Sequence, residues 1–508
     1  MADVLLTHSY HLYYDRKQSR KMQPYPPLGT LYAAALLRSA GISVALFDTM
    51  LNDPEQNFQD ALKRHKPRIV VVYEDSFNFL TKMCLTRMRD VAYHILQLSR
   101  ATGATVLVNG SDASDHALEY LRQGFHSVLL GEAEETSLEL VKHLLAGRDA
   151  DSSSISGLAY LRSSTGEFMR TQRRALMRNL DALPFPARDL VDVEQYRTAW
   201  ESNHAHFSLN IVASRGCPYR CNWCAKPIYG DSFAMRSPRS VAEEMRQLKH
   251  EYGATHLWFA DDIFGLRAPW VRDLADEVAR LDAVIPFKMQ SRVDLMTAEN
   301  VRALRRAGCA EAWLGAESGS QTILDAMDKG TRVEQIAKAR GNLRKEGIRA
   351  CYFLQFGYPG ETWTDIQKTV ELVRETRPDD IGVSVSYPLP GTRFFERVRA
   401  QLGSKTNWSD SDDLSMMFQG AYTDKFYRAL HDALHAQVDF RNSDGLSDKS
   451  RQKLHQPGAR ELWNRVVALE KTCRNSSPTI LSTSSSDGLV RLQPQVSTGD
   501  ESQGAFGT

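Results

Sequence analysis

The sequence predicts an α/β protein with an N-terminal doubly wound (flavodoxin-like) domain, a partial (βα)6 TIM-like barrel and a helical C-terminal region. Short apolar runs alternate with helical patterns in the first 145 residues, and the same alternation starts again after residue 205. A chain of 508 residues is also too long for a single core. The expected division is 1–147, 148–204 (a linker with a small hairpin), 205–400, 401–474 and 475–508.

The first alternation predicts an open parallel sheet covered by helices. The run Arg68–Tyr73 is apolar without a break, which is typical of a strand buried on both faces. Leu28–Ala40 has helical spacing and stops at Gly41. Ligands of such sheets bind beyond the carboxyl ends of the strands. The expected strands are Val4–Thr7, Ser43–Asp48, Arg68–Tyr73, Thr105–Asn109 and Ser127–Leu130.

The second alternation contains six strand–helix units, which fit a partial barrel with its chemistry at the carboxyl ends of the strands. Its expected strands are Phe207–Ala213, His256–Ala260, Phe287–Ser291, Ala310–Gly315, Ala350–Phe356 and Ile381–Tyr387. Before it, Gly157–Met169 predicts a hairpin. After it, Tyr427–Gln437 and Gly458–Lys471 have helical patterns, and the polar tail from about Asn475 is too poor in apolar residues to fold.

Composition excludes several classes of protein. The net charge is +1, so no general field attracts nucleic acid or an anionic membrane. No apolar run approaches the roughly 18 residues of a membrane span, and the N-terminus lacks a secretory pattern. Seven cysteines in 508 residues do not indicate a disulfide framework. We therefore expect a reducing cytoplasm, no nucleic-acid partner and no membrane span.

Three thiols carry the strongest signal. Cys217, Cys221 and Cys224 lie within eight residues after an apolar stretch. Three local cysteines hold three irons of a [4Fe-4S] cluster and leave the fourth iron open to a small molecule. Zinc is the alternative, but zinc usually takes four ligands, and the other cysteines are scattered singly at positions 84, 309, 351 and 473.

This Cys-x3-Cys-x2-Cys pattern resembles the radical S-adenosylmethionine (radical SAM) enzymes over about residues 205–400. The resemblance implies that the open iron chelates S-adenosylmethionine and that one electron cleaves it to a 5′-deoxyadenosyl radical. Trp223 stands where the family has an aromatic residue beside the adenine.

Further S-adenosylmethionine contacts are implied at the strand ends. The resemblance assigns the amino group to Asp261 or Asp262, the carboxylate to Arg292, the ribose or amino-acid end to Glu317 and Ser318, and the adenine to Gly357, and it points Tyr387 toward the reaction as the candidate catalytic residue. Structural alternatives stay open for the aspartates as turn or cap residues and for Arg292 as a salt bridge. For Glu361 we favour a cap of the next helix.

The N-terminal strand ends resemble the cobalamin-binding domain that precedes the barrel in one subfamily of these enzymes. The sequence lacks the Asp-x-His-x-x-Gly string that ligates cobalt elsewhere, so the resemblance implies cobalamin with no histidine on its lower face. A domain used only as scaffold is the alternative. The implied cobalamin contacts are Pro27, Leu28, Gly29, Thr30, Glu74, Asp75, Ser76, Gly110, Ser111, Gly131 and Glu132.

Together the resemblances imply an oxygen-sensitive, cobalamin-dependent radical methyltransferase that acts on an unactivated carbon. Its substrate would be a small or lipid-like molecule, and its electron donor a flavodoxin or ferredoxin. A cyclase or rearrangement enzyme with the same cofactors and a non-catalytic cobalamin and cluster sensor are the alternatives. The segment Asn407–Phe418 could frame the substrate, although we favour ordinary packing for it.

Overall fold

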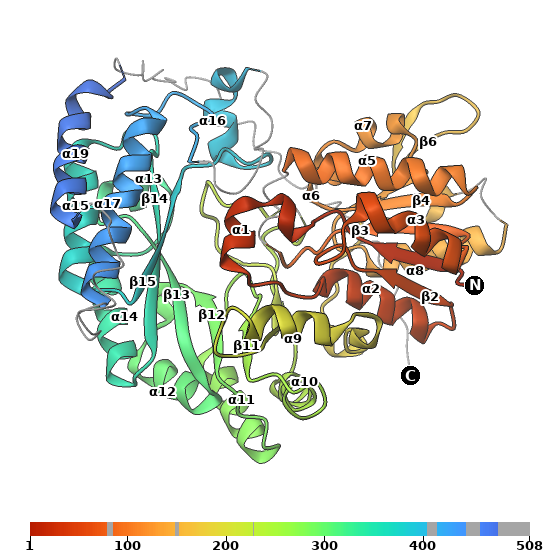
Figure 1. Ribbon diagram of the computed structural model, residues 1–508, viewed down its shortest axis with the longest axis horizontal. Helices are drawn as coiled ribbons and strands as arrows, with labels where there is room; N and C mark the ends of the chain where they lie inside the picture. Colours follow the sequence, from red (N-terminus) through yellow and green to blue (C-terminus); the bar gives the residue numbers. More distant parts are fainter. Residues whose placement is uncertain (79–84, 148–151, 227, 404–413, 443–457, 476–508) are drawn as a thin grey trace, which may run out of the picture.

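The computed structural model describes residues 1–78, 85–147, 152–226, 228–403, 414–442 and 458–475. Two sheets stand side by side, and the helices of the C-terminal region flank the far edge of the second sheet (Figure 1). Predictions for Cys84, for residues 407–412 and for nearly all of the tail after residue 475 lie outside the described residues. Within the described chain, no helix is both long and apolar enough to cross a membrane.

The first sheet has the strand order β2-β1-β3-β4-β5-β6-β7, and β1 to β5 are parallel. This order confirms the flavodoxin-like prediction and places the crossover point between β1 and β3. The strands are β1 (Val4–Thr7), β2 (Val44–Phe47), β3 (Ile69–Tyr73), β4 (Thr105–Asn109), β5 (Ser127–Leu129), β6 (Leu158–Leu161) and β7 (Phe168–Arg170).

Helices cover both faces of this sheet, so all five residues of β3 are buried, as the unbroken apolar run predicts. One face carries α2 (Leu28–Ser39) and α8 (Glu134–Leu145). The opposite face carries α3 (Pro54–His65), α5 (Thr86–Ala101) and α7 (Ala117–Gln123), next to the short α6 (Ser111–Asp115).

The predicted hairpin is present, but it extends the first sheet and is not a free linker. β6 pairs antiparallel with β5, and β7 pairs with β6. The domain limits derived from the sequence therefore stay a prediction.

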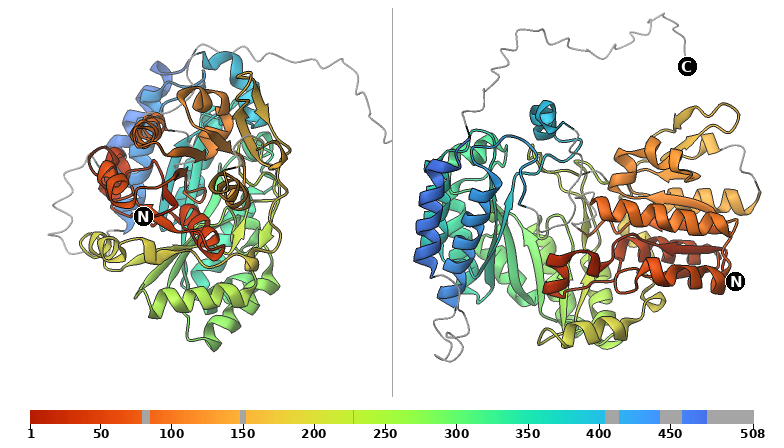
Figure 2. Two further views of the ribbon diagram at one scale, coloured as in Figure 1. Left: turned by 90° about the vertical axis from the view of Figure 1, so that its right-hand side faces the viewer. Right: turned by 45° about the horizontal axis from the view of Figure 1, so that its top comes forward.

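The second sheet is entirely parallel, in the order β15-β14-β13-β12-β11-β8, and its two open edges make it a partial barrel (Figure 2). Its strands are β8 (Ser208–Ile211), β11 (His256–Phe259), β12 (Phe287–Ser291), β13 (Cys309–Glu317), β14 (Arg349–Phe356) and β15 (Asp380–Val385). All six predicted strands are confirmed, and β13 runs on to include Glu317 as its last residue.

Amphipathic helices follow the barrel strands and bury their apolar faces in one large core. They are α10 (Pro238–His250), α11 (Ala268–Arg280), α12 (Ala298–Ala307), α13 (Gln321–Ala326), α14 (Val333–Lys345), α15 (Trp363–Thr376) and α16 (Arg393–Leu402). The two predicted C-terminal helices are α17 (Asp424–Asn442) and α19 (Ala459–Thr472), which pack on each other.

The two sheets are joined by α9 (Val193–Glu201) and by the segment after α1 (Arg16–Lys21). The Trp200 indole donates to the Pro24 carbonyl at 2.7 Å, and Tyr196 donates to Asp48 Oδ2 at 2.6 Å. Both side chains are fully buried, so the joint is part of the protein interior.

Candidate functional site

The three predicted ligand cysteines follow β9 (Ser214–Arg215), which pairs with β10 (Ala234–Met235). Cys217, Cys221 and Cys224 are free thiols, each half-buried. Three thiols on one short loop are the donor set that an iron–sulfur cluster needs. Nowhere in the described chain are three His, Cys, Asp or Glu side chains gathered closely enough to hold a metal ion. The ligand assignment therefore stays a prediction that rests on residue type and spacing.

Arg215 fixes the start of the cysteine loop to the first sheet. Its guanidinium lies 2.5 Å from Glu132 Oε1 and 2.8 Å from Glu134 Oε1, and all three side chains are nearly inaccessible to solvent. The guanidinium also faces the rings of Tyr32 and Phe77. Because both carboxylates follow β5, this ion-pair cluster holds the carboxyl edges of the two sheets together.

Asn222 fixes the middle of the loop. Its amide nitrogen donates to Asp328 Oδ2 and to the Ala326 carbonyl, both at 2.8 Å, and its Oδ1 accepts from the Tyr358 hydroxyl at 2.8 Å. Sequence reasoning missed Asn222, because its partners lie more than a hundred residues away. The loop between two predicted ligands is thus held before any metal is bound.

Lys226 fixes the end of the loop. Its ammonium donates to the Cys217 carbonyl at 3.0 Å and to the Tyr219 carbonyl, and it pairs with Asp231 at 2.5 Å. Lys226 therefore ties the end of the loop back to its start through charge-assisted hydrogen bonds.

Two cations lie beside the thiols. Arg292 Nη1 is 4.0 Å from Cys221 Sγ, and its guanidinium stacks on Tyr219 at 3.7 Å. Lys329 lies 6.0 Å from the Trp223 ring and feels the charge of Cys221. Arg292 is also paired with Asp294 at 3.0 Å, so the salt-bridge alternative is present and the contact with the methionine carboxylate stays a prediction.

Lys329 is a site residue that sequence reasoning missed. It donates to Glu317 Oε1 at 2.7 Å inside the protein, where the burial penalty of each charge is offset by the other. A Cβ on Gly315 would lie 2.6 Å from Lys329 Nζ, so the glycine makes room for the pair. Glu317 itself has φ +59°, a left-handed conformation that turns it from the strand toward Lys329. A lysine twelve residues after the glutamate of the Gly-x-Glu-Ser string was the available signal.

The structure separates the two aspartates at the end of β11. Asp261 is fully buried, accepts from the Ala213 amide at 3.1 Å and the Ser214 hydroxyl at 2.5 Å, and has its pKa raised to about 7 by burial. It therefore acts as a brace of the backbone before the cysteines. Asp262 is half-buried and lies near Cys217, whose thiol pKa is raised mainly by burial and to a smaller extent by the charge of Asp262. Of the two, Asp262 is the better candidate contact.

Hydrogen bonds within the protein hold the ends of β13 and β14, where Ser318 and Gly357 were predicted to contact S-adenosylmethionine. Ser318 and Thr369 share a hydrogen bond of 3.2 Å, which ties the end of β13 to α15. The Gly357 amide donates to Glu361 Oε2 at 2.6 Å.

The expectation that Glu361 caps the next helix is wrong. Thr362 caps α15 in a capping box with Asp365, and Glu361 instead folds back onto Gly357. Burial raises the pKa of Glu361 to about 8. Its Oε1 and the nearby Tyr427 hydroxyl have no hydrogen-bond partner within the described chain.

Two predicted residues have a defined place but no tested role. The Trp223 indole N–H is buried and finds no acceptor among the described residues, which leaves a donor for a bound molecule. Tyr387 follows β15 and packs partly buried against the barrel core. Adenine contact and catalysis, respectively, stay predictions for them.

At the edge of the first sheet, the predicted polar residues mostly bind one another's backbone. Asp75 Oδ1 accepts from the Gly29 amide at 2.9 Å, and Glu74 accepts from the Ser9 amide at 3.1 Å. Thr30 donates to the Tyr73 carbonyl at 2.6 Å. These carboxylates shape the loops around the crossover point and are not open to solvent.

The remaining predicted cobalamin residues fall into three groups. Pro27 and Leu28 open α2, and Ser76 shares a 3.1 Å hydrogen bond with Tyr229 of the cysteine segment. Gly110 and Gly131 take positive φ and allow close packing against Glu74 and Ile228. The Glu132 side chain is occupied by Arg215 and by the Met177 amide, which counts against the predicted cobalamin contact for that residue.

A small pocket lies at this edge, with a cavity volume of ≈ 20 Å³, which is room for about one water molecule. Ser111 lines it, and the Ser111 hydroxyl is buried without a partner in the described chain. Arg89 and Asp112 also line it and form an ion pair, with 2.6 Å between Arg89 Nη2 and Asp112 Oδ1. Other lining residues include Ser9, Glu74, Leu85, Met88, Val108 and Tyr120.

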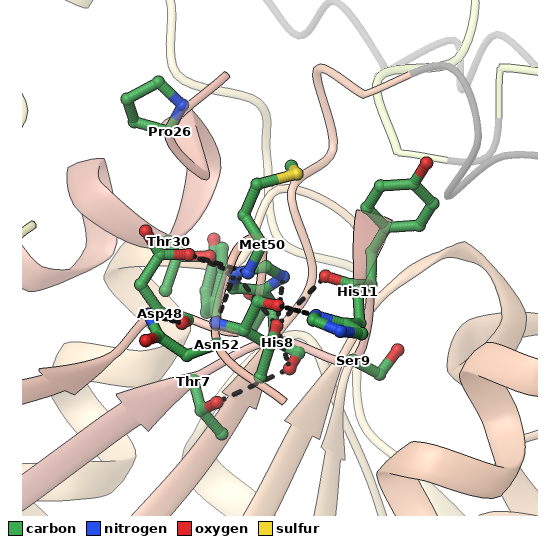
Figure 3. A network of polar contacts seen from close by, with 12 residues as sticks. Thr7, His8, Ser9, His11, Pro26, Thr30, Asp48, Met50 and Asn52 are labelled. Atoms are coloured by element: carbon green, nitrogen blue, oxygen red, sulfur yellow. Dashed lines mark hydrogen bonds and ion pairs between the residues drawn. The ribbon is translucent and has the colours of Figure 1, made fainter. Parts of the chain in front are cut away.

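A second network braces the loops after β1 and β2 (Figure 3). His8 Nε2 lies 3.0 Å from Asp48 Oδ1, and His11 Nδ1 lies 2.8 Å from the Thr49 carbonyl. The Thr49 hydroxyl also donates to the His8 carbonyl at 2.9 Å. The network makes the crossover edge rigid beside the joint between the sheets.

Comparisons with known proteins agree with this geometry. Residues 211–373 match the radical SAM superfamily. The chain is 28% identical over 392 residues to an uncharacterized methyltransferase of Pyrococcus horikoshii (75% of this chain, 81% of the relative). It is 24% identical over 395 residues to the anaerobic magnesium-protoporphyrin IX monomethyl ester cyclase of Rubrivivax gelatinosus (76% and 68%). Its fold is similar to that of the radical S-adenosylmethionine methyltransferase TsrM of Kitasatospora setae, solved with cobalamin and a [4Fe-4S] cluster (TM-score 0.64, 19% identity, 80% and 76% covered).

Proposed function

We propose, since the chain belongs to the radical SAM superfamily, that it is a cobalamin-dependent enzyme that methylates an unactivated carbon. One observation carries the proposal. The cysteine loop leaves the barrel and is joined by Arg215 to Glu132 and Glu134 at the edge of the doubly wound sheet. A cluster on this loop and a cofactor at the sheet edge would therefore share one space.

In this proposal, Cys217, Cys221 and Cys224 hold the [4Fe-4S] cluster. Asp262, Arg292 and the Glu317–Lys329 pair surround the amino-acid end of S-adenosylmethionine, and the Trp223 N–H supplies a free donor. When bound, these cofactors supply a 5′-deoxyadenosyl radical, and cobalamin supplies a methyl group. The chain's own part is to orient both and to exclude water.

We propose that cobalamin lies over the edge of the first sheet, because the pocket beside Ser111 is too small to enclose it. The pocket beside Ser111 and the rigid loops at Gly29 and Glu74 offer a built surface at the crossover point, where doubly wound folds bind ligands. The unpartnered Ser111 hydroxyl provides a hydrogen bond for a polar ligand. We propose these residues, rather than Glu132, as the contacts.

A cyclase is the second candidate, because the relative of Rubrivivax gelatinosus carries that name. Both candidates need a small-molecule substrate and a one-electron donor, for which we propose a flavodoxin or ferredoxin in a reducing cytoplasm. A sensor without turnover is less consistent with the charged residues gathered at the barrel edge.

The test uses anaerobically reconstituted protein with dithionite and S-adenosylmethionine. We expect 5′-deoxyadenosine from the native chain and none from a variant with all three cysteines changed to alanine. Substrate-dependent S-adenosylhomocysteine would indicate methyl transfer, and its absence during product formation would indicate the cyclase. If the native, iron-loaded protein forms no 5′-deoxyadenosine, the proposal is wrong.

A further inference from the structure

The inner face of the barrel sheet carries an aromatic pair that belongs to no hydrophobic core. Trp313 of β13 and Phe353 of β14 stack with ring centroids 4.9 Å apart at 30°. Their strand neighbours Leu314 and Leu354 point to the other face and are buried in the large core under the helices. The pair therefore lies on the side of the sheet that the helices do not cover.

These rings are unusually accessible. The Phe353 side chain is 37% exposed, although its strand lies inside the sheet between β13 and β15. Next to it on β15 stands Gly382, where a Cβ would come within 3.3 Å of the Phe353 ring. The glycine leaves the ring faces clear, so a flat apolar surface remains available to a ligand.

Lys288 places a positive charge on this face near the amino-terminal ends of the strands. Lys288 Nζ lies 5.4 Å from the Tyr25 ring centroid and 5.8 Å from that of Trp258. Its register neighbour Glu311 is already bound to Arg349 at 2.8 Å and to the Trp313 indole at 2.7 Å. Among the described residues Lys288 forms no ion pair and only a long hydrogen bond of 3.5 Å to Gln23 Oε1, so its charge is available to an anion.

Gln355 places an unpaired hydrogen-bond acceptor on this face near the carboxyl-terminal ends of the strands. Gln355 follows Phe353 by two residues and so shares its face. Its Nε2 donates to the Ser386 hydroxyl at 3.1 Å, but its Oε1 is buried with no partner in the described chain. A buried amide oxygen of this kind indicates that a bound molecule supplies the donor.

We propose that this inner face binds the substrate, and that the substrate combines a flat system of two or more rings with an anionic group and a hydrogen-bond donor. Trp313 and Phe353 stack on the rings, Lys288 pairs with the anion, and Gln355 accepts from the donor. Strand rise and spacing place the Cα atoms of Lys288 and Gln355 about 20 Å apart, which a single ring between the two side chains would not fill. The inference rests on the proposed function, because it names the substrate class of that reaction.

The test is a fluorescence titration of the reconstituted protein with a matched pair of probes. 1-Anilinonaphthalene-8-sulfonate carries rings, an N–H and an anion, and N-phenyl-1-naphthylamine lacks only the anion. Lys288→Gln should weaken binding of the sulfonate probe about tenfold and leave the affinity for the neutral probe unchanged. Phe353→Ala should weaken both about tenfold.

Two surface variants serve as controls. Lys249→Gln removes a half-buried lysine of α10 that pairs with Asp282, and Val284→Ala removes an apolar residue that is 41% exposed elsewhere. Neither should change the affinity of either probe. Equal binding of both probes to the native protein, or unchanged binding in Lys288→Gln and Phe353→Ala, would overturn the inference. Failure of the proposed function appears separately, as missing 5′-deoxyadenosine, and leaves these titrations interpretable.

Discussion

The carboxyl edges of the two sheets use charge in opposite ways. At the first edge, carboxylates of Glu74 and Asp75 accept hydrogen bonds from backbone amides of neighbouring loops. At the second edge, Arg292 and Lys329 place positive charge beside the thiol of Cys221. The polar groups of the first edge are therefore used within its own loops, whereas the second edge gathers positive charge around a thiol, and the Arg215 ion-pair cluster holds the two edges together.

Removing a thiol from the second edge should have the largest effect. Cys221→Ala leaves two ligands for the cluster, so iron content should fall from about four atoms per chain to less than one. Formation of 5′-deoxyadenosine should cease. Iron analysis and electron paramagnetic resonance of the reduced protein measure the first, and chromatography the second.

The control is Cys473→Ala, which removes a buried cysteine from the C-terminal region. Its iron content should match that of the native protein. A Cys221→Ala protein with a full cluster would show that the spacing misidentifies the ligands.

Breaking the Arg215 ion-pair cluster, which joins the two sheet edges, should have the next largest effect, this time on the stability of the fold. Arg215→Met leaves Glu132 and Glu134 buried without a cation and should lower the free energy of unfolding by about 3–5 kcal/mol. Urea titration under anaerobic conditions measures the change. Arg38→Ala breaks an exposed pair with Asp189 and should cost about 0–1 kcal/mol.

A second variant distinguishes charge from packing. Arg215→Met combined with Glu132→Gln and Glu134→Gln removes the stranded charges, so much of the lost stability should return. A triple variant as unstable as Arg215→Met would mean that the guanidinium acts through packing against its aromatic neighbours.

The pH dependence of stability at Glu361 tests whether burial at the barrel edge destabilises a charged carboxylate. Burial raises its pKa to about 8 in the folded protein, above its ordinary value of 4.5, so the folded state binds the proton more tightly. The resulting stabilisation is complete below pH 4.5 and is lost as the pH rises through 8. Glu361→Gln cannot titrate, so between pH 5 and pH 8 the native protein should lose about 2–4 kcal/mol relative to the variant. Denaturant titrations at pH 5, 6.5 and 8 measure it, and parallel curves for the two proteins would contradict the assignment.

Local patterns carried most of the sequence predictions, and contacts made in the folded protein account for what those patterns missed. Strands and their ends follow from period and composition, so the cysteine loop and Glu317 were placed correctly in the fold. Glu132 stays a predicted cofactor contact, but its side chain pairs with Arg215, 83 residues away, and no local pattern indicates that pair. Glu361 was expected to cap a helix, but the adjacent Thr362 forms the cap. The Thr362-x-x-Asp365 spacing of a capping box was the signal in the sequence that could have identified this cap.

The smallest expected effect is at the first edge. Ser111→Ala removes a buried hydroxyl that has no partner within the described chain, so the free energy of unfolding should change by less than about 1 kcal/mol. Hydroxocobalamin should nevertheless bind about fivefold more weakly, because one hydrogen bond to the ligand is lost. Absorbance titration measures this. Ser114→Ala instead removes a 2.7 Å bond to the Gly110 carbonyl and should affect stability more than affinity. Equal cobalamin affinity in Ser111→Ala and the native protein would mean that the ligand lies elsewhere along the edge, and that recognition there depends on backbone alone.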